Sequence, residues 1–398
     1  MTGARRRNAL PSIFRKGISK RMKKTITIIS ALAAVLIIAA LIVIAMGPYD
    51  ARGLEYTVNP DGKTCTITGI GSCKTSVVNI PEYMDDYQVT AIGKNVFYEY
   101  TRLKEITIPS SVTSIGQGAF YNCNQLKTIV LPYALESLGS AAFYNCTSLN
   151  DVELPENLSN MGWGVFYNCR SLTKMVLPDA IKTIGDGMFY ACEALTDIQF
   201  SADVTDIGTH AFYGCSSLTE FTVPEGVTEI DNWMFAHCSS LKKITLPDGI
   251  TRIGQRAFSS CTALVDITIP SGVQDVAMYS FYECKKLETI VLPDSVTTLG
   301  VYAFDHCSAL ASVTLSKSLT EIGERTFNEC VALKSLTVPA SVKKIETAAF
   351  VNAAITDFYY EGTAAQWNAV EKASNWNGLV DFTEVICSDE TCSLAQEN

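Results

Sequence analysis

Ten cysteines recur at one fixed interval of twenty-three residues, and thiols in such a row could bind a metal ion or form disulfides. They are Cys123, Cys146, Cys169, Cys192, Cys215, Cys238, Cys261, Cys284, Cys307 and Cys330. In stacked coils, neighbouring thiols would lie ~4.8 Å apart with parallel side chains, whereas a disulfide brings its Cβ atoms to about 3.5–4.5 Å. The chain has no Cys-x-x-Cys pair and no histidine at ligand spacing, so zinc lacks support. We expect these cysteines to pack in a core as small apolar residues, with no metal and no cofactor.

Four further cysteines lie outside this series. Cys65 and Cys73 are eight residues apart and precede the series, and a disulfide between them and two free thiols are equally compatible with the sequence. Cys387 and Cys392 form a similar pair near the C-terminus, where we prefer free thiols. Free thiols in an exported protein would indicate a reducing habitat, although burial alone also protects a thiol.

Catalytic constellations are not indicated. His237 and His306 occupy the same slot three repeats apart, ~14 Å from each other, so they cannot share a metal ion or a proton relay. Carboxylates such as Asp151 and Glu153 would be open to water. The segment 71–75 lacks the glycine before lysine that a phosphate-binding loop needs. We therefore predict that the protein is not an enzyme, and an envelope hydrolase is only a remote alternative.

Phenylalanine marks the repeat that positions all these residues. It recurs at the same interval as the cysteines, at Phe97, Phe120, Phe143, Phe166, Phe189, Phe212, Phe235, Phe258, Phe281, Phe304, Phe327 and Phe350. A cysteine follows three residues later, then a leucine, then an alternating apolar segment such as Leu126-x-x-Ile129-x-Leu131. One repeat cannot bury its own Phe and Leu, but stacked repeats can. The sequence therefore predicts a leucine-rich repeat solenoid of about twelve coils, with short parallel β-strands joined by short helical or irregular turns.

Two details of the repeat predict local conformation. The Phe and Cys side chains, three residues apart, suit one face of a helical turn. Glycine precedes the Phe by four residues in 9 of 12 coils, which suits a tight bend or a positive φ. At the C-terminal end, residues 355–360 repeat the strand one residue early, and residues 362–368 read as a short helix whose Trp367 covers the last coil.

Charge and hydropathy predict that the array is attached to a membrane. Residues 1–24 contain nine basic and no acidic residues, and the apolar segment Thr25–Met46 carries no charge. At ~1.5 Å per residue this helix would span about 33 Å, enough for a hydrocarbon core of ~30 Å. The basic flank predicts a cytoplasmic N-terminus and an extracellular solenoid. The alternative is a signal peptide cleaved after Gly47, which would release a secreted protein.

The remaining residues are acidic, with 22 basic against 41 acidic side chains, which argues against nucleic acid as a partner. The predicted organisation is a basic cytoplasmic segment, a transmembrane signal-anchor helix, an N-terminal cap, the solenoid, and a C-terminal cap with a tail, at residues 1–24, 25–47, 48–91, 92–360 and 361–398.

Two exposed surfaces are candidates for binding. The outward strand positions should form a concave, mildly acidic face, and its candidate residues are Glu105, Asp151, Glu153, Lys174, Asp197, Glu220, Lys243 and Asp266. A tyrosine follows the Phe in six successive coils, from Tyr98 to Tyr213, and again at Tyr282. The tyrosines could form a ligand platform for sugars or protein, but a half-buried row that covers the edge of the core is the preferred interpretation.

The repeat unit Ile-Gly-x-x-x-Phe-x-x-Cys-x-x-Leu-x-x-Ile-x-Leu-Pro, unbroken from Ile115 to Pro132, resembles the leucine-rich repeats of the BspA-like family. The resemblance covers about Leu54 to Cys387. It implies a bacterial cell-surface protein, and some members of the family are adhesins that bind host matrix or other cells. We therefore expect a membrane-anchored binding or adhesion module for an extracellular protein or glycan. The alternative is a structural scaffold of the cell envelope.

Overall fold

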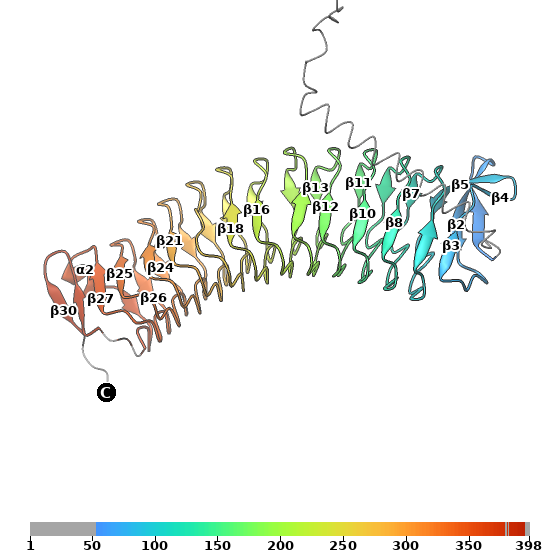
Figure 1. Ribbon diagram of the computed structural model, residues 1–398. Coiled ribbons are helices and arrows are strands. Elements are labelled where there is room, and N and C mark those ends of the chain that lie inside the picture. Colours follow the sequence, from blue (N-terminus) through green and yellow to red (C-terminus); the bar gives the residue numbers. More distant parts are fainter. Residues whose placement is uncertain (1–52, 379, 381, 395–398) are drawn as a thin grey trace, which may run out of the picture. The chain divides into compact units, whose positions relative to one another are not determined.

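The computed structural model describes residues 53–378, 380 and 382–394, which form a curved β-solenoid of about 14 coils (Figure 1). The predicted basic segment and transmembrane helix, residues 1–47, lie outside the described residues. Within the described part, no helix is long and apolar enough to cross a membrane. The solenoid has about two coils more than the predicted twelve, because the two cap segments each add a coil to the twelve that carry the repeated Phe.

Each coil contributes one strand to a first parallel ladder, here called ladder A, which the sequence did not predict. Ile or a similar residue ends most of these strands, and the repeated glycine follows it. The strands are β2 (Thr64–Gly69), β5 (Tyr87–Ile92), β7 (Ser114–Ile115), β9 (Ser137–Leu138), β11 (Asn160–Met161), β13 (Thr183–Ile184), β15 (Asp206–Ile207), β17 (Glu229–Ile230), β19 (Arg252–Ile253), β20 (Asp275–Val276), β22 (Thr298–Leu299), β24 (Glu321–Ile322), β26 (Lys344–Ile345) and β28 (Glu371–Lys372).

A second parallel ladder, ladder B, is the one that the alternating segment predicted. Its middle residue faces the core and its two outer residues face solvent in almost every coil. Its strands are β3 (Val77–Asn79), β6 (Glu105–Thr107), β8 (Thr128–Val130), β10 (Asp151–Glu153), β12 (Lys174–Val176), β14 (Asp197–Gln199), β16 (Glu220–Thr222), β18 (Lys243–Thr245), β21 (Thr289–Val291), β23 (Ser312–Thr314), β25 (Ser335–Val338), β27 (Asp357–Tyr360) and β29 (Glu384–Ile386). In one coil the corresponding residues, 266–268, do not have strand geometry.

The register of the ladders follows the period of the repeat. Asp151 pairs with Thr128 and Arg252 with Asp275. Near the end, Ser335 pairs with Asp357, one residue short of the period, as the early strand predicted.

Both ends of the solenoid are closed by antiparallel or helical elements, which protect the terminal strand edges. At the N-terminal end β1 (Glu55–Val58) pairs with β2, and β4 (Tyr83–Met84) forms an antiparallel hairpin with β5. At the C-terminal end α2 (Ala364–Asn368) is the predicted short helix, and β30 (Thr391–Ser393) pairs with β29. Trp367 is 2% exposed and packs on Tyr360 and Phe358.

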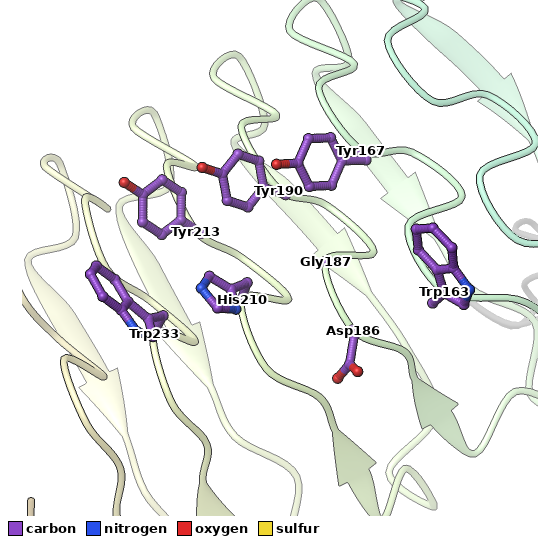
Figure 2. A pocket seen from close by; sticks show the side chains of 8 residues that line it. All are labelled: Trp163, Tyr167, Asp186, Gly187, Tyr190, His210, Tyr213 and Trp233. Carbon is purple, nitrogen blue, oxygen red and sulfur yellow. The ribbon is translucent and has the colours of Figure 1, made fainter. Parts of the chain in front are cut away.

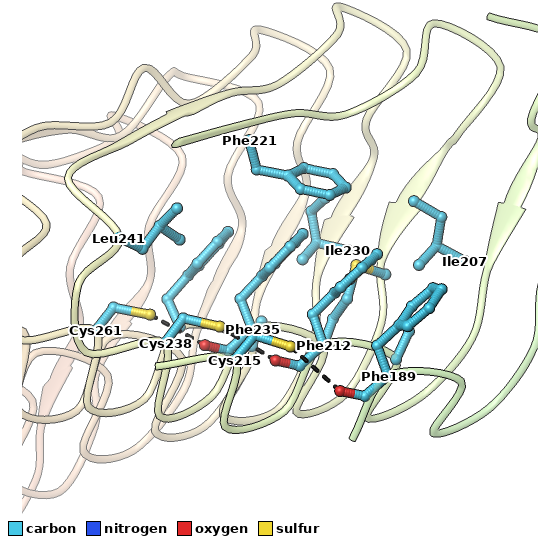
Figure 3. Packing of buried hydrophobic residues seen from close by; sticks show 14 of the residues in the cluster. Phe189, Ile207, Phe212, Cys215, Phe221, Ile230, Phe235, Cys238, Leu241 and Cys261 are labelled. Carbon is cyan, nitrogen blue, oxygen red and sulfur yellow. Dashed lines mark hydrogen bonds between the residues drawn. The ribbon is translucent and has the colours of Figure 1, made fainter. Parts of the chain in front are cut away.

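The core is a continuous stack of the repeated phenylalanines (Figure 3). Successive rings are nearly parallel, as for Phe212 and Phe235, whose centroids are 5.5 Å apart. All ten repeated cysteines are fully buried, as predicted. Each also donates its S–H to the Phe carbonyl of the preceding coil, as Cys215 does to Phe189 at 3.2 Å. The same carbonyl also accepts the backbone N–H of the cysteine in its own coil, as Phe189 does from Cys192 at 3.1 Å, so the thiol supplies a second hydrogen bond to the carbonyl oxygen while its sulfur packs as an apolar group.

The segment around each Phe is not the helical turn that the spacing predicted. Only alternate N–H groups bond within the turn, as Cys123 does to the Phe120 carbonyl at 3.1 Å. The others bond to the next coil, as Phe120 does to the Ala142 carbonyl at 2.8 Å. This pattern places the residues two before and two after each Phe in the left-handed region. They include Asn122, with φ 61°. Positions are counted below from the Phe of each coil, so these are positions −2 and +2.

Where position −4 holds glycine, the residue allows close approach and does not adopt a positive φ, which corrects one of the two predicted reasons for it. A Cβ on Gly300 would lie 2.2 Å from the Met278 backbone nitrogen, and one on Gly139 would lie 2.3 Å from that of Gln117. Neither glycine has a positive φ. The missing side chain therefore lets the backbones of neighbouring coils pack against each other.

Candidate functional site

Six tyrosines at position +1 form one continuous stack along the edge of the solenoid. They are Tyr98, Tyr121, Tyr144, Tyr167, Tyr190 and Tyr213, and their successive centroids lie 4.7, 4.6, 4.3, 4.1 and 4.4 Å apart. Five of the six are half-buried, and Tyr98 at the start is exposed. The preferred interpretation of a half-buried row is therefore confirmed for most of its length, because each ring covers the face of the next.

A second stack, at position −2, takes over where the first one ends. It consists of His210, Trp233, Arg256, Tyr279, Tyr302 and Arg325. His210 lies on Trp233 at 5.7 Å, and the Arg256 guanidinium lies 4.6 Å from the centroid of Trp233 and 4.3 Å from that of Tyr279. Tyr279 and Tyr302 stack at 4.6 Å. Cation–π and aromatic contacts of this kind stabilise by about 0.5–1.5 kcal/mol each.

The two stacks replace each other along the solenoid, so few coils carry a large side chain at both positions. In the coils with a stacked tyrosine before Phe212, position −2 holds a small or short residue, such as Gly118, Ala141 or Gly187. In most later coils position −2 is large and position +1 is small or polar, such as Ala236 or Ser259. The coil of Phe212 carries a member of each stack, His210 and Tyr213, which are 6.0 Å apart, and the coil of Phe281 has tyrosines at both positions, Tyr279 and Tyr282, which meet edge to face at 5.7 Å.

A shallow hollow of about 460 Å³ lies at this handover (Figure 2). Tyr167, Tyr190 and Tyr213 form one long wall, with their hydroxyl groups pointing the same way. The hollow is open because position −2 of this coil is Gly187, whereas a large side chain at this position would extend the second stack by one coil. Figure 2 shows the two ends of the hollow, with Trp163 at one and His210 with Trp233 at the other. The eighth lining residue is Asp186.

Trp163 has the one large aromatic face in the hollow that no stack covers. Its side chain is 52% exposed, and no ring or cation stacks on it within the described part of the chain. The two faces of Trp233, in contrast, are taken by His210 and Arg256. An indole face left open beside a gap can receive a flat or apolar ligand surface.

The polar groups of the hollow are a carboxylate, an imidazole and phenols. Asp186 Oδ1 accepts the Thr209 N–H at 2.9 Å, which fixes the carboxylate beside Gly187. Burial lowers the pKa of His210, although Asp186 and Asp231 nearby oppose that shift, so the imidazole is neutral at pH 7. Burial also raises the pKa of Tyr213, which remains a phenol that can donate and accept hydrogen bonds.

The tyrosine wall leaves no space between its own rings. Successive tyrosine rings are 4.1–4.7 Å apart, whereas successive Phe rings are 5.3–5.9 Å apart. The wall therefore offers a ligand its ring edges and hydroxyl groups, and its ring faces are covered.

The residues predicted for the binding face are all exposed to solvent, and all of them except Asp266 lie on outer positions of ladder B strands. One column contains Glu105, Asp151, Lys174, Asp197, Glu220, Lys243 and Asp266, and Glu153 lies in the other. The second column also exposes Val130, Val176 and Val291. These residues form a strip along the rod and no pocket, so their role in binding and their position on a concave face stay predictions.

The remaining candidate residues are dispersed. Cys65 and Cys73 are free thiols with separate contacts, to the Tyr87 carbonyl and to Thr75 Oγ1, and a disulfide between them stays a prediction. Cys387 and Cys392 are also free, with sulfur atoms 3.9 Å apart. Among residues 53–394, leaving out 379 and 381, no three His, Cys, Asp or Glu side chains gather as a metal site.

Sequence reasoning missed the second stack and therefore the hollow. The tyrosines were identified from the sequence, but the exposure of position −2 was not, because a helical turn was predicted around each Phe. The sequence does contain a signal for this stack, because the large side chains are at position +1 before Phe212 and mostly at position −2 after it.

The family model described as BspA type leucine rich repeat region (6 copies) matches residues 71–194, 115–242, 182–308 and 234–356. The chain therefore belongs to the BspA-type leucine-rich repeat family, as the repeat unit predicted. This is a family of bacterial surface proteins whose solenoid is consistent with a protein-binding module. Leucine-rich repeat proteins are a non-enzymatic fold class.

Solved structures show the same fold. A leucine-rich cell surface protein from Faecalibacterium prausnitzii A2-165 is 27% identical with a TM-score of 0.59, and the match covers 82% of this chain and 98% of that one. A leucine-rich repeat protein from Bacteroides ovatus is 26% identical with a TM-score of 0.70, covering 82% and 90%. The pneumococcal vaccine antigen PcpA, 20% identical with a TM-score of 0.55 over 84% and 97%, shares the fold. No curated protein matches the chain significantly.

Proposed function

We propose that this protein is a binding and adhesion module held at the outer face of a cell membrane, where it recognises an extracellular protein or glycan. The observation that carries the proposal is the open face of Trp163 in the hollow at the handover between the two stacks. Within the two stacks the ring faces are covered by neighbouring rings or guanidinium groups, except at Tyr98 at the free end of the first stack and at His210, which borders the hollow, whereas the large indole face of Trp163 is open. Exposed aromatic side chains beside a pocket are typical anchors of binding sites.

The membrane anchor in this proposal is Thr25–Met46. Its support is the length of this uncharged apolar segment and the nine basic residues that precede it. The Faecalibacterium relative, described as a cell surface protein, supports an exported solenoid. With this topology the N-terminus is cytoplasmic and the hollow faces the outside of the cell.

Protease treatment of intact cells tests the topology. Cells that produce the full chain with a different tag at each end are treated with proteinase K, and the membranes are then washed with carbonate. We expect loss of the C-terminal tag, protection of the N-terminal tag, and retention of the protected fragment in the membrane. A protected C-terminal tag contradicts export, and recovery of a shortened chain in the medium shows cleavage after the apolar segment.

Adhesion of the same cells to immobilised matrix proteins and mucin tests the binding role. We expect adhesion to at least one surface, reduced at least tenfold by Trp163→Ala and unchanged by Tyr302→Ala, which removes an aromatic side chain outside the hollow. Equal expression and equal protease accessibility of the three proteins control for folding. Adhesion to no surface, together with crosslinks only to other envelope proteins, would favour the scaffold role.

A further inference from the structure

We infer that the hollow is a carbohydrate site that takes one uncharged pyranose ring of a glycan between Trp163 and His210. The inference rests on the proposed binding function and names its ligand class.

The spacing of the coils sets the width of the site. Trp163 and His210 belong to coils separated by one intervening coil, which supplies Gly187 and Asp186. Two steps of ~4.8 Å place the backbones that carry these two side chains about 10 Å apart along the solenoid. Carbon surfaces in contact are ~3.5–4 Å apart, so this opening accepts one puckered ring with its C–H groups against the indole face.

The polar groups around the opening match a polyol. The Asp186 carboxylate, held by Thr209, has a second oxygen without a hydrogen-bond partner among the described residues. It can accept hydrogen bonds from ring hydroxyls, and the phenols of Tyr190 and Tyr213 line the wall beside it. A sugar presents apolar C–H faces and hydroxyl edges, and both kinds of surface find partners in this site.

A cationic group fits less well. An ammonium ligand needs several free aromatic faces around it, but the tyrosine faces and both faces of Trp233 are already covered. The Arg256 guanidinium beside Trp233 adds a positive charge near one end of the hollow. A volume of about 460 Å³ also exceeds what a lone ammonium group fills. These contacts favour a neutral ring over a lysine-like or quaternary ammonium ligand.

Saturation-transfer NMR and tryptophan fluorescence titration of the full-length chain test the inference. The probes are the methyl pyranosides of glucose, galactose, mannose and N-acetylglucosamine, with tetramethylammonium chloride for comparison. The detergent must lack a sugar head group. We expect at least one pyranoside to bind with a Kd on the order of 1 mM. Because the ligand is uncharged, we expect its affinity to change little between about 50 and about 500 mM salt, a range over which screening weakens the attraction of a charged ligand.

Three variants locate the binding. Trp163→Ala removes the open face and should weaken binding at least tenfold. Gly187→His fills the gap by continuing the second stack, and should abolish binding. Its backbone already suits a histidine, since Gly187 has φ 56° and His210 has φ 57°. Tyr302→Ala should bind as the unchanged chain does. Far-ultraviolet circular dichroism checks that each variant is folded.

Three results would overturn the inference: no pyranoside binds, binding is unaffected by both Trp163→Ala and Gly187→His, or tetramethylammonium binds at the same site more tightly than any sugar. If the first occurs while cells still adhere to an unglycosylated protein, the carbohydrate inference fails and the proposed function stands. If adhesion is absent as well, both fail.

Discussion

Replacing Phe212 by alanine tests whether stacked phenylalanines hold the solenoid together. Phe212 is fully buried in a central coil. Its ring centroid lies 5.6 Å from that of Phe189, 5.5 Å from that of Phe235 and 4.9 Å from that of Phe221. The substitution therefore leaves a cavity that borders three aromatic rings. None of these rings can fill it without leaving its own place in the stack.

The expected loss of unfolding free energy is near the upper end of the range for such changes. Phe-to-Ala substitutions in cores cost about 3–5 kcal/mol, and each aromatic pair adds about 0.5–1.5 kcal/mol beyond the buried area. With three pairs lost, we expect about 5 kcal/mol for Phe212→Ala. Phe97→Ala is the matched control at the end of the stack. Phe97 has one stacked partner, Phe120 at 5.3 Å, and should cost about 3 kcal/mol.

Urea unfolding followed by circular dichroism measures both losses from the midpoint and the slope of the transition. A repeat array can unfold in segments, so hydrogen exchange of the amides around each substituted coil is the companion measurement. A loss below ~1 kcal/mol for Phe212→Ala, or a larger loss for Phe97→Ala than for Phe212→Ala, would refute the stacked core as the main source of stability.

Three further predictions concern the backbone, the thiols and the imidazole. Gly300→Ala should destabilise by at least ~1–3 kcal/mol in urea unfolding, because its Cβ meets the neighbouring backbone at 2.2 Å, whereas Gly249→Ala, with no atom closer than 3.9 Å, should be neutral or stabilising. Ellman's reagent at pH 8 should label the ten repeated cysteines only after unfolding, because burial raises the pKa of Cys238 to about 12; rapid labelling of the native chain beyond the four cap cysteines would contradict this. The folded pKa of His210 is below its unfolded value of ~6.5, so the unfolded chain binds the proton first and stability should fall as the pH drops below about 6.5. The difference in melting temperature between pH 7.5 and pH 5 should therefore be smaller for His210→Phe than for the unchanged chain. An equal difference in the two proteins would contradict this prediction.

The sequence was sufficient to predict the solenoid because a strict period leaves few arrangements that bury every member. Phe212 or Cys215 alone indicates little, but their equivalents in one repeat after another, at an unchanging interval, require stacking. The buried cysteines and the early last strand followed from the same spacing. The two additional coils were missed because their segments lack the repeated Phe, so the period alone could not count them.

The hollow could not be predicted because it depends on backbone conformation. Spacing could not distinguish a helical turn from alternating bonds to the next coil, and this choice determines whether position −2 is exposed. His210, Trp233 and Arg256 are also unusual for left-handed φ, which disfavours most residues with a side chain. Their stacking on neighbouring coils compensates for this cost, and that contact is visible only in the assembled solenoid.

The uniform register between coils has a consequence for the length of the protein. Along most of both ladders each residue bonds to its equivalent one repeat away, and each Cys bonds to the Phe of the preceding coil. A duplication or deletion of one whole repeat within the array therefore creates a junction identical in kind to those on either side. Recombination between repeats can lengthen or shorten the rod by whole coils without a new interface. Outside the coils that build the hollow, from Trp163 to Trp233, the reach of the protein can thus vary between strains while the site is inherited unchanged.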